Sequence, residues 1–343
     1  MKRIVLIFVA VMLILPLMFA AVSCTKNSDE PETTENVVTT VVETDGMTTV
    51  AETENVTVTD GSVPLMWRVT DNDGHTLYLF GTIHIGDERT DAVIQRVSAV
   101  LDKCDALAVE FDSVAYQKNT QQMISDLTQY VLIGSTITDY LPEDIYNQAY
   151  DLLNKAGLTP GIFKMYNMAW WAQLVDSAMV ITCSDLDPDK GADGLLINRA
   201  YDKGMEVLEV ESSSFQMSML NSFDNELYLM MIEESLNNKE NYKNDLDTLY
   251  ELWLSGDKDA LWTFISDENE EETEYTEQQL AMLKDYNRVV VDDRNLGMRD
   301  KAIEYLKSGK TVFFAVGAAH MANEKGIVKL LSDAGYTVEP FSY

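Results

Sequence analysis

The 343-residue sequence predicts an α/β protein, with a mixed central sheet flanked by helices and a large helical insertion. Two observations carry this prediction. Short apolar runs of strand length alternate with longer segments of helical periodicity, a pattern typical of α/β folds. The intervening stretches, roughly 116–200 and 213–290, are mainly helical, and we expect them to form the insertion.

The folded part is predicted to begin with a hairpin. Two apolar and aromatic runs are separated by Asp71-Asn72-Asp73-Gly74, a typical turn sequence. A helix with Val93, Val97 and Leu101 on one face follows, and then a buried strand, which indicates a βαβ unit. These predicted elements are strands at 65–70 and 77–80, a helix at 90–103 and a strand at 105–111.

The second half of the chain is predicted to contribute three further strands and three helices. An acidic run at 267–277 holds seven carboxylates in eleven positions, and we expect a solvated loop there. The elements predicted around it are a helix at 191–203, a strand at 205–211, one long helix at 278–308, a strand at 311–316, a helix at 321–334 and a closing strand at 337–340.

The N-terminus is predicted to be a targeting signal over residues 1–23. Lys2 and Arg3 precede an apolar run that reaches Val22, and small residues follow. The segment Ala21-Val22-Ser23-Cys24 resembles the lipobox of bacterial lipoproteins, which implies a lipidated Cys24 and a membrane-anchored, extracytoplasmic protein. An uncleaved anchor and ordinary secretion are the alternatives.

The charge of the chain excludes some classes of binding partner. Formal net charge is −32, from 25 basic and 57 acidic residues, so the basic surface that nucleic acids require is missing. Residues 24–63 are rich in Thr, Val and Glu, lack aromatic residues, and are predicted to be a flexible tether. The remaining negative charge is compatible with metal cations and cationic peptides. The sequence leaves the oligomeric state open.

Two other cysteines, Cys104 and Cys183, follow Cys24 in the sequence. They could form one disulfide or remain as two buried thiols, since spacing does not show proximity.

The most informative feature is a short motif that occurs twice, each time at the end of a predicted strand. Gly81-Thr-Ile-His84 and Gly317-Ala-Ala-His320 are each a Gly-x-x-His that follows an apolar run, and the chain has three histidines in all. Glycines let the backbone turn sharply and approach a ligand closely. Ligands of open α/β sheets lie outside the carboxyl ends of the strands, so we expect His84 and His320 to project there. The third histidine, His75, lies in the predicted turn and is expected to be exposed.

Two histidines could hold a divalent cation together with carboxylates. Glu110 ends the strand after the first motif, and Glu211 ends a later one, with Glu209 as a competitor on the same strand face. The long predicted helix contains Arg294, which could stabilise an oxyanion. Each of these residues could instead have a purely structural role.

These motifs together resemble the TraB/GumN family, which includes the TIKI metalloproteases. The resemblance covers residues 64–343 and rests on the two Gly-x-x-His motifs and on shorter pieces between them. These pieces are Leu107-Ala-Val-Glu110, Gly191-Ala-Asp193, Val210-Glu211-Ser212 with Gln216, and Asp293-Arg294-Asn295 with Met298. It implies an α/β fold related to erythromycin esterases and ChaN-like proteins.

For TIKI-like members the resemblance implies metal-dependent peptide hydrolysis. His84, His320 and Glu110 match the expected metal and acidic site, Arg294 the arginine of the long helix, and Glu211 a further site position. The expected cofactor is a divalent cation such as Mn²⁺, Co²⁺ or Zn²⁺, with Glu110 either a ligand or the base that deprotonates water. The alternatives are a lipoprotein that binds a peptide or haem without catalysis, and a metal-independent esterase.

Overall fold

The computed structural model describes residues 65–266, 275–322 and 324–341. The signal predicted over 1–23, the lipidation site Cys24, the tether predicted over 24–63 and most of the acidic run at 267–277 lie outside the described residues. Among the described residues, no helix is both long enough and apolar enough to cross a bilayer.

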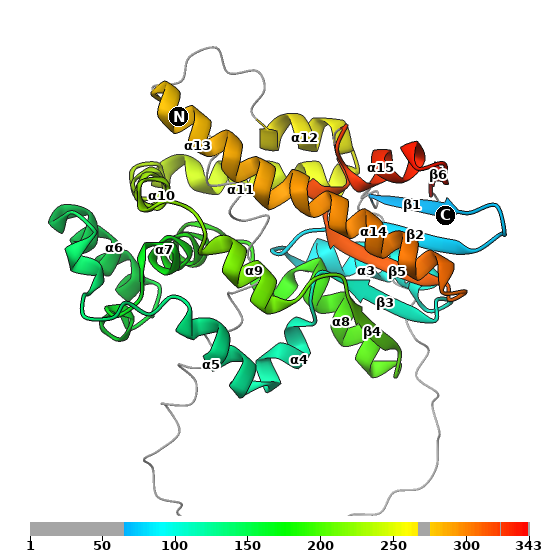
Figure 1. Cartoon of the computed structure of the whole chain (residues 1–343), viewed down its shortest axis with the longest axis horizontal. Helices are drawn as coiled ribbons and strands as arrows, with labels where there is room; N and C mark the ends of the chain where they lie inside the picture. Colours follow the sequence, from blue (N-terminus) through cyan, green and yellow to red (C-terminus); the bar gives the residue numbers. More distant parts are fainter. Residues whose placement is uncertain (1–64, 267–274, 323, 342–343) are drawn as a thin grey trace, which may run out of the picture.

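The centre of the molecule is a six-stranded mixed sheet in the order β4-β3-β5-β2-β1-β6 (Figure 1). Strands β4, β3, β5 and β2 are parallel, and β1 pairs antiparallel with both β2 and β6. The predicted hairpin is confirmed as β1 and β2. The strands are β1 Met66–Thr70, β2 Thr76–Thr82, β3 Ala106–Val109, β4 Glu206–Glu209, β5 Val312–Gly317 and β6 Thr337–Pro340.

The position of β5 brings the two Gly-x-x-His motifs together. Although it is fifth in the chain, β5 lies between β2 and β3. The two strands of the predicted βαβ unit, β2 and β3, are therefore not neighbours in the sheet. Gly81 is opposite Val316, and Thr82 is opposite Gly317. Both motifs therefore leave the same edge of the sheet, on neighbouring strands.

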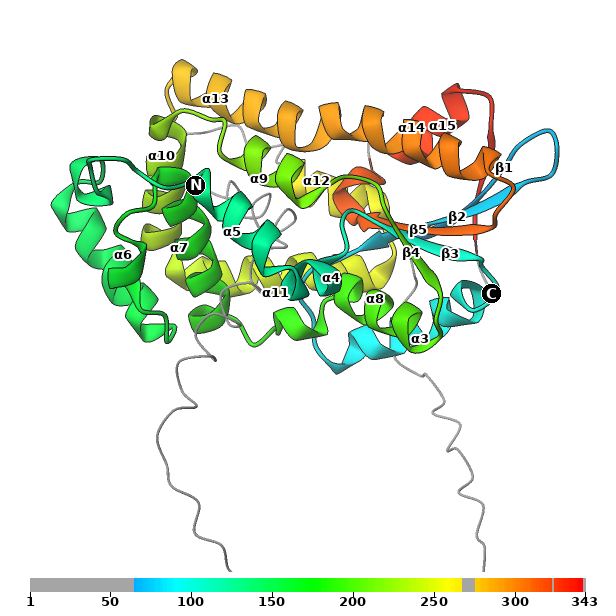
Figure 2. The ribbon, with the colours of Figure 1, turned by 60° about the horizontal axis from the view of Figure 1, so that its bottom comes forward.

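Helices cover both faces of the sheet (Figure 2). Helices α3 Glu88–Leu101 and α8 Ala192–Asp202 pack together on one face, and α14 Asp293–Lys307 and α15 Ile327–Asp333 pack on the other. The core strands β3 and β5 are buried along their whole length, as expected for parallel strands covered on both sides.

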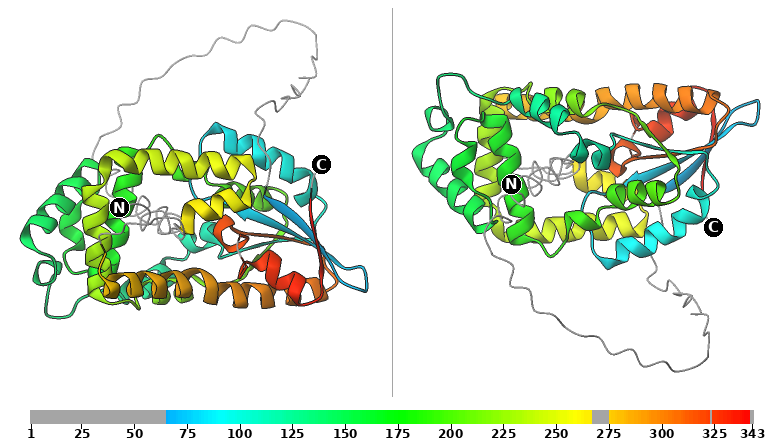
Figure 3. Two further views of the ribbon diagram at one scale, coloured as in Figure 1. Left: turned by 90° about the horizontal axis from the view of Figure 1, so that it is seen from above. Right: turned by 90° about the horizontal axis from the view of Figure 1, so that it is seen from below.

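The helical insertion extends from the carboxyl edge of the sheet. In Figure 3, α11 and the α13–α14 helix run along opposite sides, and α6, α7 and α10 form the end far from the sheet. Its helices are α4 Ser113–Lys118, α5 Thr120–Thr128, α6 Glu143–Lys155, α7 Met168–Cys183, α9 Ser213–Leu220, α10 Asn225–Asn237, α11 Lys239–Ser255, α12 Lys258–Ser266 and α13 Glu277–Asn287.

Two predicted helices differ in detail. The long helix over 278–308 is continuous but contains a π-helical turn, Arg288–Asp292, between α13 and α14. The helix predicted at 321–334 begins six residues later, because a 3-10 turn at Ala318–His320 and Gly326 precede it. Cys104 and Cys183 are both free thiols, as one of the two alternatives predicted, but only Cys104 is buried, and Cys183 is half-buried.

The inner helices bury an acidic side chain. Asp176 on α7 accepts a hydrogen bond from the Tyr242 hydroxyl (2.8 Å), and its second oxygen has no hydrogen-bond partner among the described residues. Burial raises the pKa of Asp176 to about 7, although the Tyr242 hydrogen bond opposes this shift. Between about pH 4 and pH 7, the folded protein therefore keeps a proton on Asp176 that the unfolded chain has released.

We expect Asp176→Asn to change how stability depends on pH. Because folding raises the pKa of Asp176, protonation of this carboxyl stabilises the folded state. The stabilisation is complete below about pH 4 and is lost as the pH rises through 7. The variant should lack this loss and exceed the wild type by about 2–4 kcal/mol in free energy of unfolding at pH 8. Urea unfolding at pH 5 and pH 8 measures it, and an equal difference at both pH values would contradict the assignment.

Candidate active site at the carboxyl edge of the sheet

The structure brings the predicted site residues together at one edge of the sheet. Glu110 follows β3, and Glu211 follows β4, where its N–H donates to the Glu110 carbonyl oxygen (2.8 Å). His84 lies two residues beyond β2, and His320 is in the 3-10 turn after β5. The two histidines, Glu110 and Arg294 are buried, and the Glu211 side chain is 9% exposed.

Arg294 joins the two glutamates. Its Nη2 contacts Glu110 Oε2 (2.5 Å) and Glu211 Oε2 (2.7 Å), and its Nε donates to Glu211 Oε1 (3.0 Å). Nη1 donates to the carbonyl oxygen of Val290, which belongs to the π-helical turn. The guanidinium is 1% exposed, so this is a buried ion pair between one cation and two carboxylates.

Glu110 is held at both oxygens. Gln216 Nε2 donates to Oε2 (3.0 Å) and also to Glu211 Oε2 (2.9 Å), while the Gly317 N–H donates to Glu110 Oε1 (2.9 Å). Burial alone would raise the pKa of Glu110, but the charge of Arg294 outweighs it and, together with the hydrogen bond from the Gly317 N–H, holds the pKa below its usual value. Glu110 is therefore ionised at neutral pH.

Glu209 and Glu211, the two candidates on one predicted strand, have different positions. Glu209 is the last residue of β4, is exposed, and accepts a hydrogen bond from the Asp112 N–H (2.9 Å). Glu211 lies beyond the strand and reaches Arg294. The candidate that sequence reasoning preferred is the one beside Glu110.

His84 is oriented by an aspartate. Its Nδ1 donates to Asp193 Oδ2 (2.7 Å), and Asp193 Oδ1 accepts from the Thr82 hydroxyl (2.6 Å). Asp193 is the second residue of α8, whose N-terminus approaches the first motif closely. At Gly191 a Cβ would lie 2.5 Å from the His84 carbonyl oxygen, so only glycine permits this approach.

His320 has a matching partner on another element. Its Nδ1 donates to Asn295 Oδ1 (2.7 Å), and Asn295 Nδ2 donates to the Lys325 carbonyl oxygen (3.0 Å). The opposite ring nitrogen, Nε2, lies 3.9 Å from Glu110 Oε1. Burial, helped by the charge of Arg294, lowers the pKa of His320 to about 3, so its imidazole is neutral at pH 7.

The two motif glycines serve different purposes. A Cβ at Gly81 would meet Ala318 at 3.1 Å and Leu65 at 3.3 Å, so the absent side chain allows the turn after β5 to pack against β2. Gly317 contributes its backbone N–H to Glu110. Neither residue is among the glycines with positive φ, so close packing explains Gly81 better than unusual backbone geometry does.

A family comparison covers the region that contains all of these residues. The model of the TraB/PrgY/gumN family matches residues 65–340, which is most of the chain. The chain belongs to this family. No curated protein matches the chain at a significant level.

This TraB/PrgY/gumN protein has three site residues to which sequence reasoning gave no role: Asp193, Asn295 and Gln216. All three lie in the short pieces that carried the family resemblance, and Asn295 directly follows Arg294. The available signal was their proximity in sequence to other site residues, with Asp193 two positions after Gly191, Gln216 five after Glu211 and Asn295 next to Arg294. Their functions depend on contacts with His84, His320 and Glu110, which are 25 to 109 positions away.

The donor set in this family member fits a divalent cation. Metal-bound histidines commonly carry a hydrogen bond on the other ring nitrogen, as His84 and His320 do, and ligands must be neutral imidazoles and ionised carboxylates. One cation could contact both His320 Nε2 and Glu110 Oε1 at their 3.9 Å separation. The ligand atoms of His84, His320 and Glu110 do not all lie within 4.8 Å of one another, so at least one of these side chains would have to move for all three to bind one cation.

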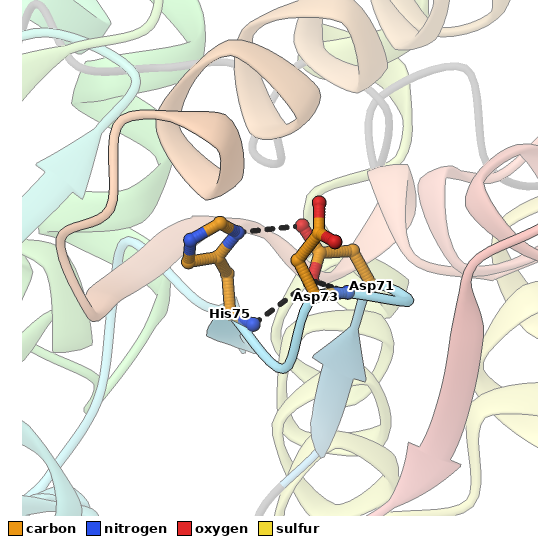
Figure 4. A group of neighbouring side chains, drawn as sticks. All are labelled: Asp71, Asp73 and His75. Carbon is orange, nitrogen blue, oxygen red and sulfur yellow. Dashed lines mark hydrogen bonds and ion pairs between the residues drawn. The ribbon is translucent and has the colours of Figure 1, made fainter.

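A second group of potential ligands lies at the opposite end of the β1–β2 hairpin. Asp71, Asp73 and His75 can each place one ligand atom within 4.8 Å of the others (Figure 4). Asp71 accepts hydrogen bonds from the His75 ring (2.7 Å) and from the Asp73 and His75 N–H groups, which is how an aspartate stabilises a tight turn. Turn formation accounts for this cluster.

Proposed function

We propose that this protein is a metal-dependent hydrolase that acts on peptides. The observation that carries the proposal is that the two Gly-x-x-His motifs leave neighbouring strands beside one buried carboxylate, Glu110, which accepts from the Gly317 N–H and lies 3.9 Å from His320 Nε2. Both imidazoles have their Nδ1 bonded, and both motifs leave the carboxyl edge of the sheet, where α/β proteins place their ligands. The choice of peptides rests on the likeness of the motifs to those of TIKI-like proteases.

The proposal assigns a role to each of the main site residues. His84, His320 and Glu110 would hold the cation, and Asp193 and Asn295 keep the two imidazoles oriented. The Arg294 ion pair holds the pKa of Glu110 below its usual value and so makes it a weaker base, which suits a ligand better than a general base. When bound, the cation would polarise the scissile carbonyl and lower the pKa of a water molecule.

Arg294 receives a different role from the oxyanion stabiliser expected from the sequence. Its contacts to Glu110, Glu211 and Val290 all lie within the protein, and its guanidinium is 1% exposed. We assign it the role of fixing Glu110 in its ionised form. Buried counter-charge is what an ionised carboxylate requires in a site shielded from water.

The proposed location is outside the cytoplasm, on a membrane, through a lipid at Cys24. The tether proposed over residues 24–63 would hold the catalytic domain away from the lipid surface. This part of the proposal rests on the N-terminal sequence.

Metal content tests the proposed function. We expect purified protein to retain about one equivalent of Mn²⁺, Co²⁺ or Zn²⁺ after dialysis, and His84→Ala with His320→Ala to lose it. His75→Ala is the matched control, because His75 lies on the hairpin away from the site and should leave the metal content unchanged. Elemental analysis measures all three proteins. Wild-type protein that retains no divalent metal would refute the cofactor.

One observation favours a second candidate, a metal-independent esterase. The hydrogen bond from His84 Nδ1 to Asp193 also orients a histidine that acts as a general base. Ester hydrolysis that survives EDTA but is lost in His84→Ala would support this candidate over the metalloenzyme.

A further inference from the structure

A pocket lies directly beside His84. It lies between the two Gly-x-x-His turns and the helices α11 and α12, and its space is about 340 Å³ when the open solvent at its mouth is counted. The side chains that matter for its chemistry are Leu249, Trp253, Leu261, Ile265 and Ala318, with His84 at one border.

The lining is apolar except at the border with the site. Helix α11 contributes Leu249 and Trp253, and α12 contributes Leu261 and Ile265. No carboxylate, lysine or arginine is among the lining residues. Gly317, whose N–H binds Glu110, also lines the pocket, so the pocket and the candidate active site share a wall.

Trp253 makes one wall rigid. Its indole N–H donates to the Gly81 carbonyl oxygen (2.8 Å), and its ring stacks on Tyr250 with centroids 6.0 Å apart. Phe80 contacts the same ring edge-on, with centroids 6.4 Å apart. Since Trp253 is only 2% exposed and its polar atom is already bonded, this wall is formed before any ligand arrives.

We propose that this pocket is a specificity subsite that receives one aliphatic side chain of the substrate, of leucine or methionine size, next to the bond that is cleaved. The inference rests on the proposed function, because it takes the reacting bond to lie beside His84 and Glu110. The pocket is small and mostly apolar, which suits one aliphatic side chain rather than a long acyl chain. His84 and Thr82 are the polar lining side chains apart from the bonded indole of Trp253, and none is a carboxylate, lysine or arginine, so burying a charged group there would be costly.

A peptide series tests the subsite by binding and by cleavage separately. The probes are acetyl-Ala-Ala-X-Ala-Ala-amide with X as Gly, Ala, Leu, Phe or Asp. Calorimetry on the full chain in EDTA measures binding, and mass spectrometry with Mn²⁺, Co²⁺ or Zn²⁺ measures cleavage. We expect the Leu peptide to bind about 10- to 100-fold more tightly than the Gly peptide, from burial of its side chain. The Asp peptide should be the weakest.

Substitutions at Leu249 should shift this preference in opposite directions. Leu249→Phe narrows the pocket and should move the preference from Leu toward Ala, and Leu249→Ala enlarges it and should move the preference toward Phe. Leu252→Ala and Leu252→Phe are the matched controls, because Leu252 is on the same helix, is partly buried and does not line the pocket. These controls should keep the wild-type order.

The outcomes separate the subsite from the hydrolase. Selective binding that changes with Leu249, without cleavage of any peptide, supports the subsite and refutes the hydrolase. Cleavage without preference at X, or with a preference that the Leu249 variants leave unchanged, overturns the subsite and leaves the hydrolase standing. Failure of every peptide both to bind and to be cleaved overturns the subsite.

Discussion

Replacing Arg294 with methionine should lower the free energy of unfolding by about 3–5 kcal/mol, because it leaves two buried carboxylates without their cation. Glu110 and Glu211 share Arg294 Nη2, and both accept from Gln216, so the two carboxylates are close neighbours. Without the guanidinium they would repel each other in a site shielded from water. Urea unfolding monitored by circular dichroism measures the loss.

Arg288→Met is the control for this prediction. Arg288 lies six residues earlier on the same helix and pairs with Asp285 and Asp293, but its side chain is 51% exposed. Exposed ion pairs contribute about 0–1 kcal/mol, so this variant should stay close to the wild type. Adding Glu110→Gln and Glu211→Gln to Arg294→Met should recover part of the stability. Equal destabilisation by Arg294→Met and Arg288→Met would contradict the structural role given to Arg294.

Changing Glu110 to glutamine should reduce hydrolysis by at least about 10- to 100-fold, because replacing residues that only orient a metal ligand already costs that much. The amide keeps the shape of the side chain, and its oxygen can still accept the Gly317 N–H. It removes the negative charge beside His320 Nε2, which is what the proposed cation requires. The ratio kcat/KM for a cleaved peptide measures the effect.

Glu209→Gln is the matched control for the carboxylate. Glu209 is exposed at the end of β4 and does not contact the histidines or Arg294, so its amide should keep wild-type activity. Thermal melting would show that both variants are folded. If Glu110→Gln retained more than a tenth of the activity while folded, Glu110 would not be part of the catalytic machinery.

Much of the α/β framework follows from local patterns. The apolar runs that form β1, β2, β3 and β5 are confirmed within a few residues, because alternating or continuous burial along a strand is visible in the sequence. The site candidates were found by the same logic, since a polar residue that directly follows a buried strand reaches the edge where parallel strands end. Helix ends were less predictable. The 3-10 turn that holds His320 packs against β2, and the π-helical turn before Arg294 packs against α9 and that 3-10 turn, so both depend on tertiary contacts.

The sequence by itself determined the strands, the paired motifs and the residues at their ends, because these depend on nearest neighbours and on which faces are buried. Only the tertiary structure decided that β5 enters between β2 and β3, so that His84 and His320 leave adjacent strands. It also decided that Arg294 is enclosed by two carboxylates and that α11 and α12 form an apolar wall beside His84. Those contacts join residues far apart in the chain, and they are set by how whole elements pack.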